Sequence, residues 1–264
     1  VALWDGSKYL MEYGAFVYGI PAAQSFWDQP VASLWEIAGF ARGREYSLPK
    51  RDPRKPPSDQ DDISLVAPEL PWALSSIQEI IHTPHQTNHL FPGQSFPDPS
   101  FTLNQFCTAL KSRRFNVGLI ATHAYPGASP ETSYLLFSEG WLSFHQLRQR
   151  DPNLFAHLDL LFLGACQTGV DNQQTTGVFD SIAELSVRMG ARAIVGSLRK
   201  IDDASAFAFT RHFFSLKKEN PQWSKIKLLQ TAQLDFAYNR VAGLKTDWQA
   251  SYHWSPYILV GNWH

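Results

Sequence analysis

From residue 117 to the end of the chain, short apolar runs alternate with longer stretches of helical spacing. The apolar runs have the length of strands and lie at 117–122, 158–164, 191–197 and 256–261. The stretches between them predict helices at 143–150, 178–189, 203–216 and 224–241, the last with Ser224 as its N-cap. Strands that are buried on both faces form near-continuous apolar runs. The alternation therefore predicts an α/β fold with a mainly parallel sheet covered by helices on both faces.

The part of the chain before residue 117 is less regular, and its pattern predicts a mixture of short elements. We expect short strands or a hairpin in 1–20, a short helix at 32–40, helices at 74–81 and 104–111, and irregular chain at 84–99. A hairpin at 134–144 should turn at Glu139-Gly140. Residues 43–62 combine four prolines with charges of both signs, so we expect an exposed, mobile loop there rather than a domain boundary.

The charge balance and the cysteine count limit the classes of function. Of the 264 residues 44% are hydrophobic, and the net charge is −1, which argues against the broad basic face of a nucleic-acid-binding protein. The two cysteines do not form a disulfide framework, which favours the reducing cytoplasm. No apolar run reaches the length of a membrane span. Because Val1 rather than methionine opens the chain, we expect a piece of a longer protein.

Two residues with catalytic chemistry follow neighbouring apolar runs of the predicted sheet. His123 closes the run at 117–122, and Cys166 closes the run at 158–164. The carboxyl ends of parallel strands meet at one edge of a sheet, so both side chains should reach the same edge. A thiolate can attack a carbonyl carbon, and an imidazole can hold or deliver a proton near neutral pH. The pair therefore predicts a cysteine nucleophile, Cys166, with His123 as its partner.

Such a reaction also needs donors for the developing oxyanion. The backbone amides of Ala124 and Cys166 are the candidates, because both stand at strand ends. Gly164 and Gly169 allow the backbone to turn sharply beside the cysteine.

Other readings of these residues are less favoured. A cysteine phosphatase needs an arginine six residues after the nucleophile, where this chain has Asn172. His82, His85 and His89 lie close together but lack a thiol or carboxylate at metal-ligand spacing, so we predict neither a metal nor a cofactor. Cys107 falls inside a predicted helix and is expected to be structural.

Several segments in order resemble the CHAT domain, a caspase-like module that often stands beside TPR repeats and is distantly related to separase. The segments that carry this resemblance are Leu3-Trp4-Asp5-Gly6, Ala121-Thr122-His123, Gly164-Ala165-Cys166-Gln167-Thr168-Gly169, Gly190-Ala191-Arg192-Ala193 through Asp202-Asp203, and Trp254-Ser255-Pro256-Tyr257. Ala124 and Arg199-Lys200 depart from the family pattern, which has Gly and Trp-Pro at those places.

The resemblance implies one caspase-hemoglobinase-like domain, a three-layer α/β/α sandwich, over residues 1–264, without the family's first strand and without the TPR region. It implies a cysteine endopeptidase that cleaves a specific protein partner, as a regulated component of bacterial signalling or defence. In separase-like relatives an acidic residue in the loop after 191–197 holds a basic P1 side chain, which points to Asp202 or Asp203. Arg199 would instead favour an acidic P1, and Asp203 could simply cap the helix that begins there.

Two alternatives remain open at this point. A caspase-like binding module without catalysis would also fit the departures at Ala124 and Arg199. Some members of the family it resembles are protease subunits of RNA-guided CRISPR complexes, which is the second alternative. A TPR region or a partner protein would then regulate the protease. In neither case do we expect this chain to bind nucleic acid or a membrane directly.

Overall fold

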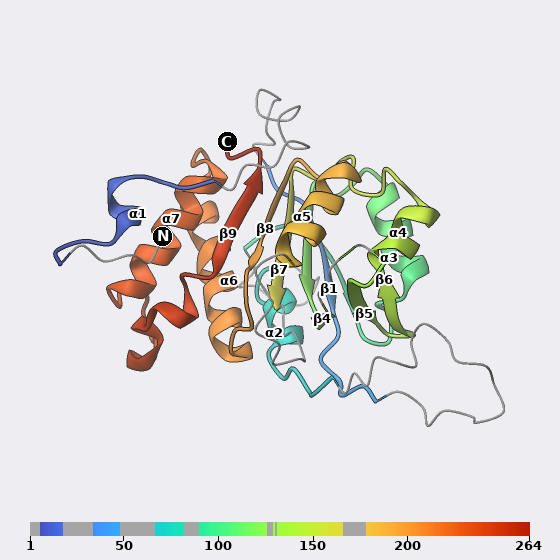
Figure 1. Cartoon of the computed structure of the whole chain (residues 1–264), viewed down its shortest axis with the longest axis horizontal. Coiled ribbons are helices and arrows are strands. Elements are labelled where there is room, and N and C mark those ends of the chain that lie inside the picture. Colours follow the sequence, from blue (N-terminus) through green and yellow to red (C-terminus); the bar gives the residue numbers. More distant parts are fainter. Residues whose placement is uncertain are drawn as a thin grey trace.

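A computed structural model describes residues 6–17, 34–47, 67–81, 90–125, 129, 131–165 and 178–264. At its centre is a six-stranded sheet with the order β2-β1-β3-β7-β8-β9 (Figure 1). The strands are β1 (Ile37–Ala41), β2 (Gly93–Pro97), β3 (Val117–Ala121), β7 (Leu160–Ala165), β8 (Ala193–Ser197) and β9 (Tyr257–Gly261). All neighbours run parallel except β8 and β9, which are antiparallel. The predicted mainly parallel sheet is confirmed.

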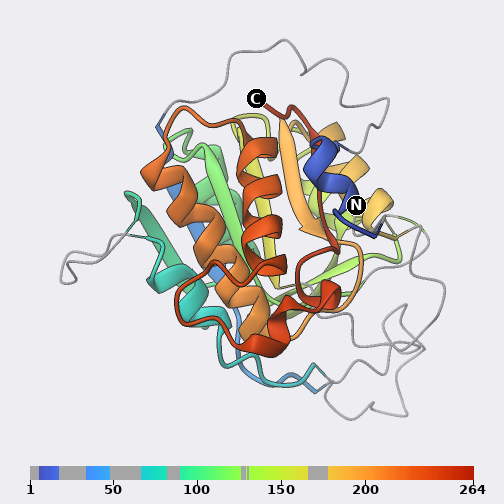
Figure 2. The same ribbon diagram turned by 90° about the vertical axis from the view of Figure 1, so that its left-hand side faces the viewer.

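Helices cover both faces of this sheet, so the fold is a three-layer α/β/α sandwich (Figures 1 and 2). One face carries α2 (Ala73–Gln78), α6 (Asp203–Glu219) and α7 (Lys225–Ala237), with α1 (Leu10–Tyr13) packed beside α7. The other face carries α3 (Leu103–Lys111), α4 (Phe144–Arg150) and α5 (Val178–Arg188). Two 3₁₀ turns, η3 (Thr246–Gln249) and η4 (Ser251–His253), lie between α7 and β9.

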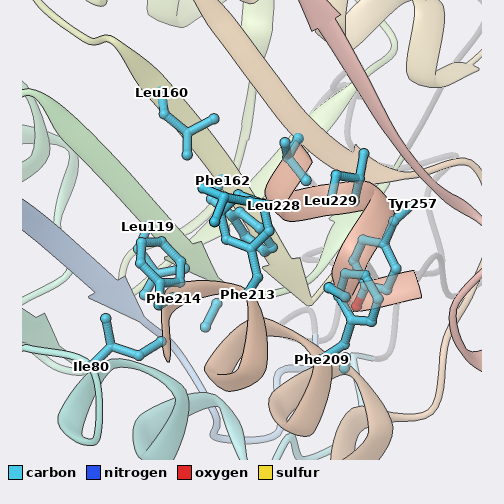
Figure 3. Close-up of a cluster of buried hydrophobic side chains, with 14 of the residues drawn as sticks. Ile80, Leu119, Leu160, Phe162, Phe209, Phe213, Phe214, Leu228, Leu229 and Tyr257 are labelled. Atoms are coloured by element: carbon cyan, nitrogen blue, oxygen red, sulfur yellow. The ribbon is translucent and has the colours of Figure 1, made fainter. Parts of the chain in front are cut away.

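The alternation of side chains along the central strands explains the two cores. In β7, Leu160 and Phe162 point into the core beneath α6 and α7, while Leu161 and Leu163 point into the core beneath α3, α4 and α5. Figure 3 shows the first of these cores, in which Phe162 meets Phe213 and Phe214 of α6. Because successive residues of a strand face opposite sides, apolar runs without alternation are what a sheet buried on both faces requires.

A small second sheet lies beside the carboxyl end of the large one. It joins β4 (Ala124–Tyr125), β5 (Tyr134–Phe137) and β6 (Gly140–Ser143) in antiparallel order. The predicted β5–β6 hairpin is present, but its turn lies at Ser138-Glu139, one residue earlier than expected, and Gly140 begins β6 at φ 130°, a value that favours glycine. Ser143 then caps α4 by accepting a hydrogen bond from the Gln146 amide.

Three predictions for the amino-terminal part are wrong. Residues 37–41 form the central strand β1 rather than the end of a helix, residues 10–13 form α1 rather than a strand, and residues 93–97 form the edge strand β2 rather than irregular chain. The helix expected at 224–241 ends at Ala237. Of the loop expected at 43–62, residues 48–62 lie outside the described residues; Tyr46 pairs with Ala67 in an antiparallel bridge.

Candidate active site

The two strands that lead to His123 and Cys166 are neighbours in the sheet. β3 and β7 pair in parallel register, and Ala121 at the end of β3 lies opposite Ala165 at the end of β7. Just before this pair the register shifts, because Ile120 faces Leu163 and Gly164 is one extra residue in β7. Such bulges re-aim the residues that follow them. Cys166 itself lies outside the described residues, and it is the next residue in the sequence after Ala165.

His123 is buried, with only 1% of its surface exposed, and its ring contacts a backbone carbonyl. The Nε2 atom lies 2.7 Å from the carbonyl oxygen of Pro68. A carbonyl oxygen can only accept a hydrogen bond, so Nε2 must carry the proton. In the neutral ring the lone pair is then on Nδ1, which makes Nδ1 the basic atom of His123.

The Pro68 carbonyl is held in place by the chain on both sides of it. Ala67 and Tyr46 exchange two backbone hydrogen bonds of 2.8 and 2.9 Å, and the Leu70 amide donates to Gly43 at 2.7 Å. Both partners follow the buried strand β1, so this short pair extends from the centre of the sheet. The carbonyl that orients His123 is therefore anchored to the rigid core.

The backbone of His123 is clamped to β5. Thr122 Oγ1 donates to the carbonyl of Leu136 at 2.8 Å, and the Leu136 amide donates to the carbonyl of His123 at 3.0 Å. In this register Ala124 and Leu135 form a non-hydrogen-bonded pair, so the Ala124 amide faces away from β5. The amide of Ala124, a predicted oxyanion donor, is therefore not used in pairing with β5. The other predicted donor, the amide of Cys166, lies outside the described residues.

The two aspartates that were candidates for a specificity pocket are both engaged within the protein. Asp202, not Asp203, is the N-cap of α6, and its carboxylate accepts from the Ser205 amide at 2.9 Å. Asp203 is buried and accepts from the backbone amide of Trp72, at the start of α2, at 2.9 Å. Burial raises the pKa of Asp203, an effect that the hydrogen bond from Trp72 opposes.

Arg199 lies two residues beyond the end of β8 and is exposed. Its guanidinium lies 5.5 Å from the ring centre of Tyr252 and donates to the hydroxyl of Ser255 at 3.3 Å. Since β9 is antiparallel to β8, the residues just before β9 reach the carboxyl end of β8. Tyr252 and Ser255 thus fix Arg199 at the edge of the sheet to which His123 belongs.

Sequence reasoning identified His123 but missed the groups that position it. Pro68 is separated from His123 by 55 residues, and a backbone carbonyl leaves no mark in the side-chain pattern. Thr122 could have been found, since it stands between a buried strand and His123, where its hydroxyl can bond to a neighbouring strand. Nothing in the sequence links Tyr252 with Arg199.

Among the described residues, no three histidine, cysteine or carboxylate side chains come together as a set of metal ligands. Nor does any helix within that part of the chain have the length and apolar character needed to cross a bilayer.

The comparison with family models decides the affiliation: the model of the CHAT domain matches residues 1–262. The chain belongs to the CHAT domain family. The resemblance seen in the motifs is thereby confirmed over nearly the whole length of this CHAT domain.

Among solved structures, this CHAT domain is similar to the complex of Porphyromonas gingivalis RgpB pro- and mature domains. The TM-score is 0.52 at 12% sequence identity, and the match covers 90% of this chain and 50% of that one. The chain thus spans half the length of that protein chain, and the likeness concerns the fold: a caspase-like α/β/α sandwich. None of the curated proteins matches the sequence.

Proposed function

We propose that this CHAT domain is a cysteine endopeptidase in which Cys166 attacks a peptide carbonyl and His123 acts as general base and general acid. The observation that carries the proposal is the position of His123. It stands buried at the end of β3, opposite the strand end that leads to Cys166, with Nε2 already bonded to the Pro68 carbonyl. Any buried histidine needs a partner for its N–H, so the distinguishing feature of His123 is that its strand ends beside the strand that leads to Cys166.

The roles follow from the tautomer. Because Nε2–H is engaged by Pro68, Nδ1 is the atom that removes the thiol proton and leaves a thiolate beside an imidazolium. The thiolate forms a bond to the carbonyl carbon, and the oxygen of the tetrahedral intermediate accepts hydrogen bonds from the amides of Ala124 and Cys166. Nδ1–H then protonates the departing amine, and water hydrolyses the thioester with His123 as the base.

The charges beside this site favour an acidic side chain in the substrate. Asp202 and Asp203 are tied to backbone amides, whereas Arg199 is exposed and held in one orientation by Tyr252 and Ser255. A fixed guanidinium recognises a carboxylate through charge-assisted hydrogen bonds. We therefore assign the P1 contact to Arg199 rather than to either aspartate. This function requires a protein as substrate.

Profiling with a proteome-derived peptide library tests both statements. Peptide termini should appear with the wild-type domain, vanish in Cys166→Ala and in His123→Ala, and carry Asp or Glu at P1. Arg199→Glu should select against those acidic residues, while Lys200→Glu, the same charge change at the neighbouring exposed position, should leave the preference intact. Termini that persist undiminished in Cys166→Ala would remove the basis for the proposal. An unchanged P1 preference in Arg199→Glu would refute the role of Arg199 alone.

A further inference from the structure

A second concave site lies on the outer side of α6, away from the sheet. It is a cavity of about 250 Å³ between the first turns of α6, the start of α2 and the segment that follows α7. Figure 2 shows this segment, in red, crossing in front of the lower part of α6 and running beside α2. We call this cavity the α6 groove. Its apolar walls are formed by Trp72, Phe207, Leu244 and Trp248, among others.

The size of the α6 groove favours a side chain over a free ligand. Pockets for drug-sized ligands occupy about 300–1,000 Å³. A cavity of about 250 Å³ has room for one large aromatic side chain with its neighbours. Trp72 is 43% exposed at the wall and stacks on Phe207 with ring centres 5.2 Å apart, so an entering ring would find aromatic surface to pack on.

The charged residues that line the groove itself are basic. None of the residues that line the groove is acidic, and Arg211, His212 and Lys245 are among them. Arg211 pairs with Glu79 at an exposed position, where such a pair contributes little, and Lys245 lies over the ring of Trp248. His212 is bonded to the carboxylate of Asp235 at 2.9 Å, so Arg211 and Lys245 carry the charge argument. The rim therefore complements carboxylates placed beside the inserted ring.

The α6 groove is connected to the candidate active site by a short piece of chain. The ring of Trp72 forms its wall, and the backbone amide of Trp72 is held by the buried carboxylate of Asp203. Four residues earlier in the same segment, the carbonyl of Pro68 orients His123. The Ala73 amide donates to Leu70 at 3.1 Å, so the segment between these points is a tight turn rather than a free loop.

We propose that the α6 groove docks a partner-protein segment that carries an aromatic side chain flanked by carboxylates, and that docking acts on His123 through Trp72 and Pro68. The docking part stands on the groove alone. The regulatory part rests on the proposed function, because it assigns an effect on the Cys166–His123 pair.

Fluorine NMR of the domain labelled with 5-fluorotryptophan tests docking without any need for activity. The probe is a short peptide with a central tryptophan flanked by glutamates on both sides. It should shift the resonances of Trp72 and Trp248 saturably. A peptide with alanine at the centre, or with lysines in place of the glutamates, should bind at least about fivefold more weakly. Ala208→Trp, which fills the groove, should abolish the shifts, whereas Thr108→Trp, an exposed position on α3, should not. The absence of a saturable shift, or equal binding of the lysine peptide, would overturn the docking proposal.

The same probe tests the coupling. At saturation it should change the alkylation rate of Cys166 near pH 6 by at least about fivefold, a common size for coupling between two sites. Binding with an unchanged rate would refute the coupling while leaving docking supported. If Cys166 shows no dependence on His123 even without peptide, the proposed catalytic pair has failed, and the NMR result still decides on docking.

Discussion

Replacing His123 by alanine should slow the alkylation of Cys166 at low pH and accelerate it at high pH. β3 and β7 are neighbouring strands, and the proposed pair requires an imidazolium and a thiolate in contact, about 4 Å apart. At that distance and an effective dielectric constant of about 20, their attraction is about 4 kcal/mol, which corresponds to about 3 pKa units. Allowing for the desolvation of a buried histidine, we expect the thiol pKa to fall from about 8.5 to about 6.

This shift has opposite consequences at the two ends of the pH range. At pH 6 the thiolate fraction would be about one half with His123 and about 0.3% without it. A thiolate of lower pKa is intrinsically less nucleophilic, by about 13-fold for this shift at a Brønsted coefficient of about 0.45. The wild type should therefore react about 12-fold faster than His123→Ala at pH 6 and about 12-fold more slowly at pH 9.5, with the profiles crossing at about pH 7.4.

The assay is alkylation by iodoacetamide with mass-spectrometric quantification of Cys166 and Cys107 in the same sample. Cys107 is an internal control, because it is buried and burial raises the pKa of its thiol. His253→Ala is the matched variant: His253 bonds to Ser205 and has no part in the proposed pair, so its profile should equal the wild type. Profiles of wild type and His123→Ala that run parallel across this range would refute the ion pair, whatever the absolute rates.

Two further predictions concern stability and are measured by urea unfolding. Asp203→Asn keeps an acceptor for the Trp72 amide but removes a buried carboxyl whose pKa is raised. The stability that Asp203 contributes is fully present below its unfolded pKa of about 3.9 and is lost as the pH rises through the raised folded pKa. The variant should therefore have a higher free energy of unfolding than the wild type at pH 7 but not at pH 3.5. An equal increase at both pH values would show that ionisation is not the cause. Lys225→Met leaves the buried carboxylate of Asp159 without its 3.0 Å partner and should cost about 3–5 kcal/mol, whereas the double variant with Asp159→Leu should recover most of that loss. A double variant as unstable as the single one would contradict this account.

The carboxyl-terminal half of the fold could be predicted because its strands and helices differ in length and spacing. Runs such as 158–164 are too short for helices and are bounded by turns, and the amphipathic stretches between them show apolar residues at helical spacing. Ile182, Leu185 and Met189 do lie in one core, as the helical pattern at 178–189 requires. Here the local pattern and the tertiary environment agree.

The amino-terminal half could not be predicted, because there the environment overrides the pattern. Residues 37–41 are buried on both faces of the sheet, so they lack the alternation that marks a half-buried strand. Strand β2 contains Gly93 and Pro97, which weaken any prediction of a strand. An edge strand tolerates both, since only one of its sides must pair.

Tertiary contacts that the local sequence does not show also determine the candidate site. The sequence shows which residue could be the base, because His123 stands where a buried run ends. Which nitrogen is basic is decided by the Pro68 carbonyl, and that contact exists only because the chain returns from β1 and pairs Tyr46 with Ala67. Orientation of the histidine is thus a property of the segment before α2 rather than of the strand that carries it. A change in this segment can alter the chemistry of His123 without touching either His123 or Cys166, which makes the chain from 67 to 72 the natural place for a partner to act.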